Sequence, residues 1–226
     1  MRFEVTEHLE NGQNFLLDGN LDAARAAFIT ALEEEPENMG ARYGLARVQA
    51  LSGETEEALA GYLEAIAAEP QARGLAWYAE LKMLGEDIGD AAERIEQAFE
   101  LDPDIAEPYL LGAELAIRAK DYDRADSLLR KGVRRGAEIG AAHVFSLYQR
   151  WVTQLVENDE AAKASEVSGR AADFFGSDVS LMLLAAKAAE TAGHKEAALE
   201  RYRDSLGKLP QGPLRIEVLE KIATLV

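Results

Sequence analysis

The 226-residue sequence contains no cysteine. This absence excludes disulfide bonds, thiol nucleophiles and zinc sites with cysteine ligands. Histidine is nearly as scarce, because only His8, His143 and His194 occur. No two of them have the three- or four-residue spacing that places a pair of metal ligands on one helix face. We therefore expect neither a metal site nor a cofactor.

Positive charge and long apolar runs are also lacking. The chain has 24 Lys and Arg against 41 Asp and Glu, a net charge of −17. Binding to nucleic acids or to anionic membranes depends on clustered Lys and Arg, so both are disfavoured. The longest apolar run, residues 181–186, is far shorter than the roughly 20 residues of a membrane helix. The first residues lack the apolar core of a signal peptide. We expect a cytoplasmic protein without membrane insertion.

The residues that are abundant favour a helical core. The hydrophobic content is 48%, and 40 residues are alanine, which loses no rotamer freedom on folding and lets helices approach closely. The six prolines all lie outside the apolar periodic segments, and Pro36, Pro70 and Pro103 recur at a nearly constant interval. Because proline marks helix boundaries, this regular spacing predicts a repeated helical pair.

Residues at fixed offsets before each boundary repeat with the same period. The five sets are Gly12, Phe15, Ala24, Phe28, Ala31; Ala46, Gln49, Ala58, Tyr62, Ala65; Ala79, Lys82, Ala91, Ile95, Ala98; Ala113, Ala116, Ala125, Leu129, Gly132; and Ala186, Ala189, Ala198, Tyr202, Ser205. This spacing resembles the tetratricopeptide repeat, a 34-residue helix-turn-helix unit. The resemblance implies an all-α, right-handed α-solenoid of about six antiparallel helix pairs with a C-terminal capping helix. Between paired helices, Gly19, Gly53 and Gly193 are expected in left-handed turns.

We expect one domain over residues 1–226. Its repeats would cover residues 5–38, 39–71, 72–105, 106–139, 140–178 and 179–212, followed by the capping helix 213–226. The fifth unit is longer than the period, which predicts a longer first helix from about residue 140 to 156. The capping helix has an apolar stripe of Leu214, Val218, Ile222 and Leu225. Ile216, Leu219 and Val226 lie partly off this stripe, so a second apolar contact such as a dimer partner stays open beside a plain cap.

The resemblance also implies a binding groove, because the first helix of each pair lines a concave face where partner peptides bind in this family. The implied groove residues are Leu9, Gln13, Tyr43, Arg47, Ala76, Trp77, Glu80, Leu110, Glu114, Ile117, Val144, Tyr148, Trp151, Leu183 and Lys187. The clamp that some members use for a C-terminal carboxylate is not expected, since Leu9, Gln13 and Gly44 occupy the matching positions. Because aromatic residues often anchor interfaces, we expect the tyrosines and tryptophans of this set to be anchors in the groove. The alternative is that both tryptophans fill the interior.

The predicted function is a non-enzymatic scaffold or adaptor that binds a partner peptide or helix. Phosphate-loop, nucleophile-elbow and kinase motifs are absent from the sequence, and the repeats occupy nearly all of it. Residues 1–103 contain 7 basic and 22 acidic residues, a net charge of −15. This charge favours a basic or amphipathic partner, although solubility alone also explains it. The alternative is an assembly protein that forms homo-oligomers through its ends or its groove. RNA binding is disfavoured by the charge.

Overall fold

The computed structural model describes residues 2–135, 141–176 and 178–226, with side chains except those of Arg2, Phe3, Val133, Arg135 and residues 141–144. Within these ranges the chain forms helices and no strand, which confirms the all-α prediction. The chain divides into two compact units, Met1–Gly136 and Ala137–Val226, here called the N-terminal and C-terminal units. A single domain over the whole chain stays a prediction.

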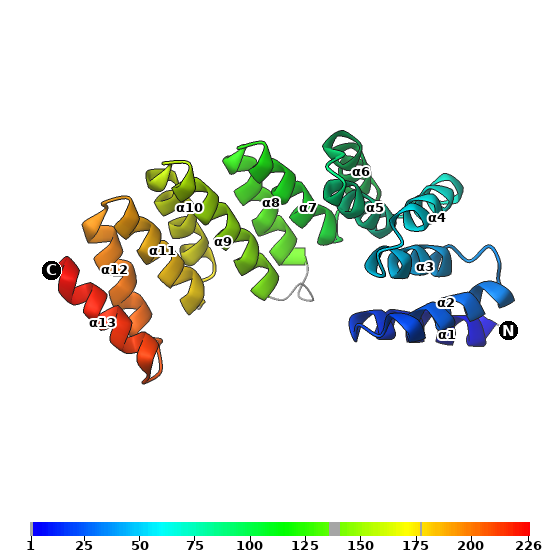
Figure 1. Ribbon diagram of the computed structural model, residues 1–226, viewed down its shortest axis with the longest axis horizontal. Coiled ribbons are helices and arrows are strands. Elements are labelled where there is room, and N and C mark those ends of the chain that lie inside the picture. The colour runs from blue at the N-terminus through cyan, green and yellow to red at the C-terminus, as the bar shows by residue number, and fades with distance from the viewer. Residues whose placement is uncertain (1, 136–140, 177) are drawn as a thin grey trace. The chain divides into compact units, whose positions relative to one another are not determined.

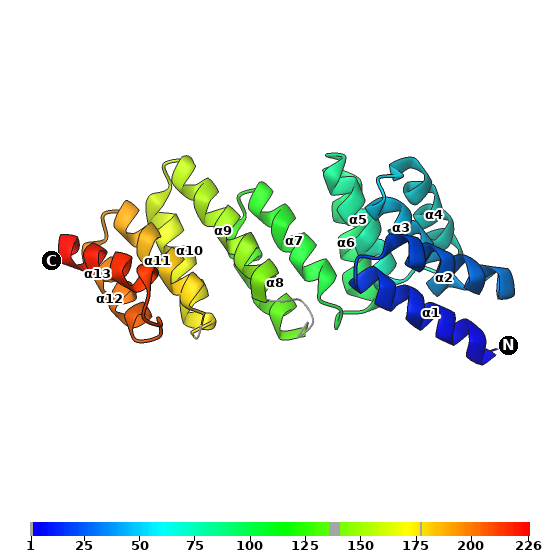
Figure 2. The same ribbon diagram turned by 60° about the horizontal axis from the view of Figure 1, so that its bottom comes forward.

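The N-terminal unit consists of successive antiparallel helix pairs (Figures 1 and 2). The pairs are α1 (Arg2–Leu17) with α2 (Leu21–Glu34), α3 (Met39–Leu51) with α4 (Thr55–Ala68), α5 (Ala72–Leu84) with α6 (Ile88–Leu101), and α7 (Glu107–Arg118) with α8 (Tyr122–Arg135). The first helices also pack against one another, because α1 contacts α3, α3 contacts α5, and α5 contacts α7. One face of this unit is therefore built from first helices only.

The C-terminal unit repeats the arrangement on a smaller scale (Figure 1). Helix α9 (Ala141–Glu157) pairs with α10 (Ala161–Phe174), α11 (Val179–Thr191) pairs with α12 (Lys195–Leu206), and α13 (Pro213–Leu225) packs on α12. Helix α9 has 17 residues where α11 has 13, in agreement with the longer first helix expected for the fifth unit.

Small residues in the second helices allow the close crossing of each pair. Alanine recurs at one register position and is fully buried in every pair, at Ala24, Ala58, Ala91, Ala125, Ala164 and Ala198. Four positions later a large side chain commonly fills the space toward the next pair. The ring of Phe28 is packed tightly in this space. A Cβ atom on Gly12 would lie 2.6 Å from the ring, and a Cβ atom on Gly44 would lie 2.4 Å from it. Only glycine at both positions lets this ring lie between α1 and α3.

Each turn within a pair contains one residue with a left-handed backbone. These are Gly19, Gly53 and Gly193, as predicted, and also Glu86, Lys120 and Asp159 with φ near 60°. The next residue donates its N–H to a carbonyl five positions earlier, as Asn20 does to Phe15 at 2.8 Å and Asp87 to Lys82 at 3.0 Å. This bond satisfies a carbonyl at the helix end. The repeated geometry shows that the six helix pairs in the described residues use the same turn.

Helix α13 covers the hydrophobic core of the last helix pair, α11 and α12, with only part of its predicted apolar stripe. Val218 is buried, and Ile222 and Leu225 pack against the core. Leu214 is 47% exposed, because it lies in the first turn, where the chain enters the helix through Gly212 and Pro213. None of the described helices has the length and apolar character needed to cross a membrane.

Candidate functional site

Three of the predicted groove residues meet between α3 and α5. The Nη1 atom of Arg47 lies 2.6 Å from Oε2 of Glu80, and its guanidinium carbon lies 5.5 Å from the ring centroid of Trp77. All three side chains are half-buried. An ion pair and a cation–π contact thus hold the arginine in one position. We call Arg47, Trp77 and Glu80 the groove cluster.

The groove cluster lies over the aromatic interior of the unit. Tyr62 from α4 is fully buried and meets the ring of Tyr78 edge-on, with centroids 6.4 Å apart. Burial raises the pKa of Tyr62 well above its ordinary value, and the nearby Arg47 guanidinium opposes this shift. Arg47 therefore sits close to a packed core as well as to solvent. Its contacts with Glu80 and Trp77 restrict the conformational freedom of its side chain.

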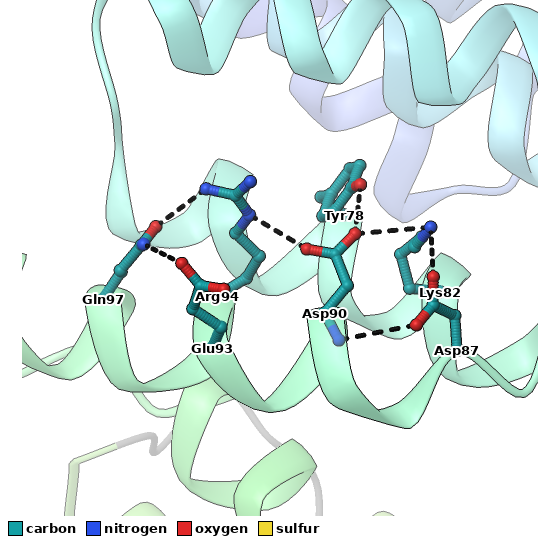
Figure 3. Close-up of polar contacts among 7 residues, drawn as sticks. All are labelled: Tyr78, Lys82, Asp87, Asp90, Glu93, Arg94 and Gln97. Carbon is teal, nitrogen blue, oxygen red and sulfur yellow. Dashed lines mark hydrogen bonds and ion pairs between the residues drawn. The ribbon is translucent and has the colours of Figure 1, made fainter.

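A polar network fixes the helix that bears Trp77 to its partner helix (Figure 3). The Tyr78 hydroxyl donates to Oδ2 of Asp90 at 2.6 Å, and Lys82 forms ion pairs with Asp87 at 2.7 Å and Asp90 at 3.3 Å. Arg94 completes the network from the other side, 3.3 Å from Asp90. The contacts of Tyr78 and Lys82 with Asp90 join α5 to α6 and so fix the helix that bears Trp77.

The carboxylate in the centre of this network has a shifted pKa. Burial by itself would raise the pKa of Asp90, but the hydrogen bond from Tyr78 and the ion pairs with Lys82 and Arg94 together lower it. The hydrogen bond to Asp87 is the main cause of a raised pKa at Lys82. Both groups are therefore charged near neutral pH, and the network acts as a structural tie.

Other predicted groove residues of the N-terminal unit have structural contacts. Tyr43 is 2% exposed, and its hydroxyl donates to the Glu69 carbonyl at 2.9 Å and accepts from the Gln71 amide at 3.3 Å. Its ring lies against Gly74, where a Cβ atom would approach to 2.1 Å. Tyr43 thus joins the second pair to the third.

The remaining predicted positions of this unit differ in exposure. Leu110 is buried, as are Ala76 and Ile117. Leu9 is half-buried and packs against the core of the first pairs, whereas Gln13 is exposed. Glu114 pairs with Arg118 on its own helix at 2.9 Å. Among the predicted positions of this unit, Gln13 is thus exposed, whereas Glu114 is half-buried like the groove cluster.

In the C-terminal unit the predicted aromatic anchors are interior. Tyr148 and Trp151 are both 0% exposed, and their rings stack with centroids 5.9 Å apart. Leu183 is half-buried against the core, and Lys187 is exposed. The side chain of Val144 lies outside the described residues.

One exposed feature escaped sequence reasoning. The first helices of the first three pairs each end on an exposed leucine, and Leu17, Leu51 and Leu84 are 86%, 49% and 76% exposed. Their spacing along the chain equals the repeat period, so they occupy one register position. Each follows a predicted groove residue by four positions, after Gln13, Arg47 and Glu80, and hence shares its helix face. We call Leu17, Leu51 and Leu84 the leucine row.

Acidic residues dominate the surface of the N-terminal unit. A depression of about 600 Å³ lies at the loops that precede α3 and α5; its lining includes Glu34, Glu35, Glu37 and Glu69. No group of histidine, aspartate and glutamate side chains in the described part of the chain is arranged to hold a metal ion.

Comparison with known proteins gives a family match over one segment of the chain and a fold for nearly all of it. A family model for the tetratricopeptide repeat matches residues 15–81. No match is found among curated protein sequences. Among solved structures, pilF of Pseudomonas aeruginosa is 20% identical with a TM-score of 0.64, and the match covers 97% of this chain and 98% of that one. At these identities the structural matches show the fold alone.

Two further structures carry the same fold. YrrB, described as a TPR protein with an unusual peptide-binding site, is 16% identical with a TM-score of 0.54, over 86% of this chain and 98% of that one. A chain of the APC/C hetero-tetramer Cut9-Hcn1 is 15% identical with a TM-score of 0.62, over 96% of this chain. This chain spans only 42% of that longer one. Residues 15–81 match the tetratricopeptide repeat, and the buried alanine and the left-handed turn of that segment recur in the other described helix pairs.

Proposed function

We propose that the protein is a non-enzymatic scaffold that binds a segment of another protein on the first-helix face of its N-terminal unit. Tetratricopeptide repeats are protein-interaction modules, and this fold is the basis of the coarse assignment. YrrB, a protein of the same fold, is described as having a peptide-binding site. The finer assignment, to a peptide or helix bound at this face, rests on the chain's own residues.

The groove cluster is the observation that carries the proposal. Trp77 presents part of a large ring to solvent while Arg47 covers one side of it. Tryptophan and arginine are the residues that most often dominate interface energetics. The pairing with Glu80 and the polar network on α5 hold both side chains in place. Little entropy is then lost on binding, which favours affinity.

The proposal is tested by comparing baits. The full chain, its Trp77→Ala variant and a Leu63→Ala control are used for affinity capture from native extract, with quantitative mass spectrometry. Leu63 lies on α4 and is 44% exposed, so its loss alters exposed apolar surface away from the first helices. We expect proteins that are retained by the wild type and the control and lost with Trp77→Ala, and titration with each purified candidate should repeat the loss. Equal capture by all three baits would contradict the proposal.

Self-association is a second candidate, favoured by the outer face of α13. Ile216, Leu219 and Val226 are 58%, 49% and 79% exposed, and with exposed Ala223 they follow a three–four–three spacing. Such spacing forms one continuous seam along a helix, as in paired coiled-coil helices. A second copy could bury this seam against its own.

Sedimentation tests this second candidate directly. If α13 forms the contact, the wild type shows a concentration-dependent increase in mass, and Leu219→Glu remains a monomer because a charge cannot be buried unpaired in the seam. A wild type that stays monomeric at the highest reachable concentration would exclude the contact.

A further inference from the structure

We infer that the leucine row is a docking ridge for a cationic amphipathic helix of a partner protein. This inference rests on the proposed function, because the row extends the same first-helix face beyond the groove cluster. The inference specifies the chemistry of the partner and the residues of this protein that would recognise it.

Recurrence separates the leucine row from ordinary surface leucines. Single exposed hydrophobic residues are common and need no function. Leu17, Leu51 and Leu84, however, occupy the same position in three consecutive pairs. The fourth pair ends its first helix with Arg118, which pairs with Glu114. The apolar row therefore covers α1, α3 and α5 and ends there.

The spacing of the row fits a helix. Because α1 contacts α3 and α3 contacts α5, the three leucines belong to neighbouring helices, and packed helices lie about 8–10 Å apart. Residues seven apart on one side of an α-helix are separated by about 10 Å. A helix lying across the three ends would therefore place one apolar side chain against each leucine.

Charge selects a cationic partner. Exposed acidic residues follow the row directly, with Asp18 after Leu17 and Glu86 shortly after Leu84. The N-terminal unit as a whole contains 14 basic and 28 acidic residues, a net charge of −14. A helix with Lys or Arg beside its apolar stripe would meet opposite charge at Asp18 and Glu86, which raises the association rate at low salt. An acidic partner would be repelled.

The test uses the full-length protein and a synthetic peptide. The probe is a fluorescein-labelled helix of about 18 residues, long enough to cover three positions at a seven-residue repeat. It carries leucine on one face, lysine on both flanks and alanine elsewhere. Two comparison peptides have the same composition with leucines scattered around the helix, or glutamate in place of lysine. Binding is followed by fluorescence anisotropy at low and high salt.

We expect the amphipathic lysine peptide to bind, and the triple variant Leu17→Ala, Leu51→Ala, Leu84→Ala to weaken it about tenfold or more, since each leucine loses buried methylene groups. The matched control Leu63→Ala with Leu101→Ala removes leucines that are 44% and 49% exposed on second helices. It should retain wild-type affinity. Circular dichroism should show both variants fully folded, because every substituted side chain is exposed.

Several outcomes would overturn the inference. These are no binding of the lysine peptide to the wild type, equal binding of the scattered or glutamate peptide, and an unchanged affinity in the triple variant. A wild-type dimer that the triple variant abolishes would also overturn it, since the row would then contact a second copy. If Trp77→Ala weakens the binding of the peptide and the triple variant does not, the proposed function is supported and the role of the leucine row is excluded. If neither variant changes binding, both fail.

Discussion

Trp77 in the N-terminal unit and Trp151 in the C-terminal unit are the only tryptophans, and their surroundings differ. Trp77 is half-buried under Arg47, whereas Trp151 is fully buried and stacked on Tyr148. The pair that contains Trp151 has Ser168 at the register position that Phe28 and Tyr62 occupy elsewhere. We attribute the burial of the α9 rings to this small residue, which leaves volume for them. The same helix-pair architecture thus buries Trp151 in its core and leaves Trp77 partly exposed at its surface.

The ends of the first helices show the same contrast. In the N-terminal unit, α1, α3 and α5 end on exposed leucines, whereas α9 and α11 end on Glu157 and Thr191. The acidic charge is also concentrated in the N-terminal unit, with a net of −14 against −3 for residues 137–226. The helix-pair architecture is shared, and the leucine row and most of the net negative charge belong to the N-terminal unit.

The largest expected effect tests whether both units share the same helix crossing. Ala58→Arg and Ala198→Arg insert a long charged side chain at equivalent buried positions. Each should lower the free energy of unfolding by about 3 kcal/mol or more, because the crossing leaves no space and the charge has no partner. Urea denaturation measures the loss, and limited proteolysis locates it in the substituted pair. Leu63→Arg, at an exposed position, is the control, and an unchanged transition would show that the register is wrong.

The two tryptophans should separate stability from binding. Trp151→Ala should lower the free energy of unfolding by about 3 kcal/mol or more, because it leaves a cavity in the core. Trp77→Ala should lower it by only about 1 kcal/mol, since a half-exposed ring buries less apolar area. Acrylamide quenching of Trp77→Phe and Trp151→Phe checks the environments independently. The tryptophan that remains in Trp151→Phe should be the more accessible, and the reverse order would contradict the comparison.

A tyrosine–carboxylate–lysine tie occurs in both units and predicts a matched pH effect. In the C-terminal unit Tyr202 donates to Glu190 at 2.8 Å, and Lys221 pairs with Glu190 at 2.7 Å. Burial would raise the pKa of Glu190, but Lys221 and Tyr202 together lower it, as Tyr78 and Lys82 do for Asp90. A lowered pKa contributes stability above the unfolded value, near 4, and this contribution is lost as pH falls through the folded pKa.

Removing the tyrosine hydroxyl should therefore lower the stability mainly above the pH range in which the carboxylate titrates. Tyr78→Phe and Tyr202→Phe should each lower the free energy of unfolding by about 1 kcal/mol at pH 7, and the difference from wild type should shrink below about pH 4. Urea titrations at a series of pH values measure this. A difference that stayed constant down to low pH would mean that the hydroxyl does not stabilise the carboxylate.

The smallest expected effect concerns the turns. Glu86→Gly and Lys120→Gly in the N-terminal unit, and Asp159→Gly in the C-terminal unit, relieve a left-handed backbone. Each should raise the free energy of unfolding by about 0.5 kcal/mol, since the relieved strain exceeds the added flexibility of the unfolded chain. Gly53→Ala is the opposite control and should destabilise. A loss of stability in all three glycine variants would contradict the shared turn.

The fold was predictable because its determinants are local and periodic. Ala58 and Gly53 have equivalents in other pairs, so one spacing predicts the crossing and the turn. The exposure of the groove residues was not predictable in this way. Tyr43 is buried because Gly74, which lies in the following pair, lets its ring approach, and periodicity within one pair does not show this.

The leucine row was missed for a related reason. Leucine is usually interpreted as a core residue, yet Leu17 and Leu84 end their helices, where the chain turns away and leaves them uncovered. Their signal in the sequence is a spacing equal to the repeat period, immediately before the turn residues. A search for apolar residues at helix ends with this period would have found them.

Hydrogen exchange on the full chain with the amphipathic lysine peptide tests the central claim most directly, namely that the first-helix face of the N-terminal unit is the working surface. The account predicts slower amide exchange in α1, α3 and α5 on binding, with no change in α9 and α11. Protection confined to the C-terminal unit, or spread evenly over second helices such as α4 and α6, would contradict it.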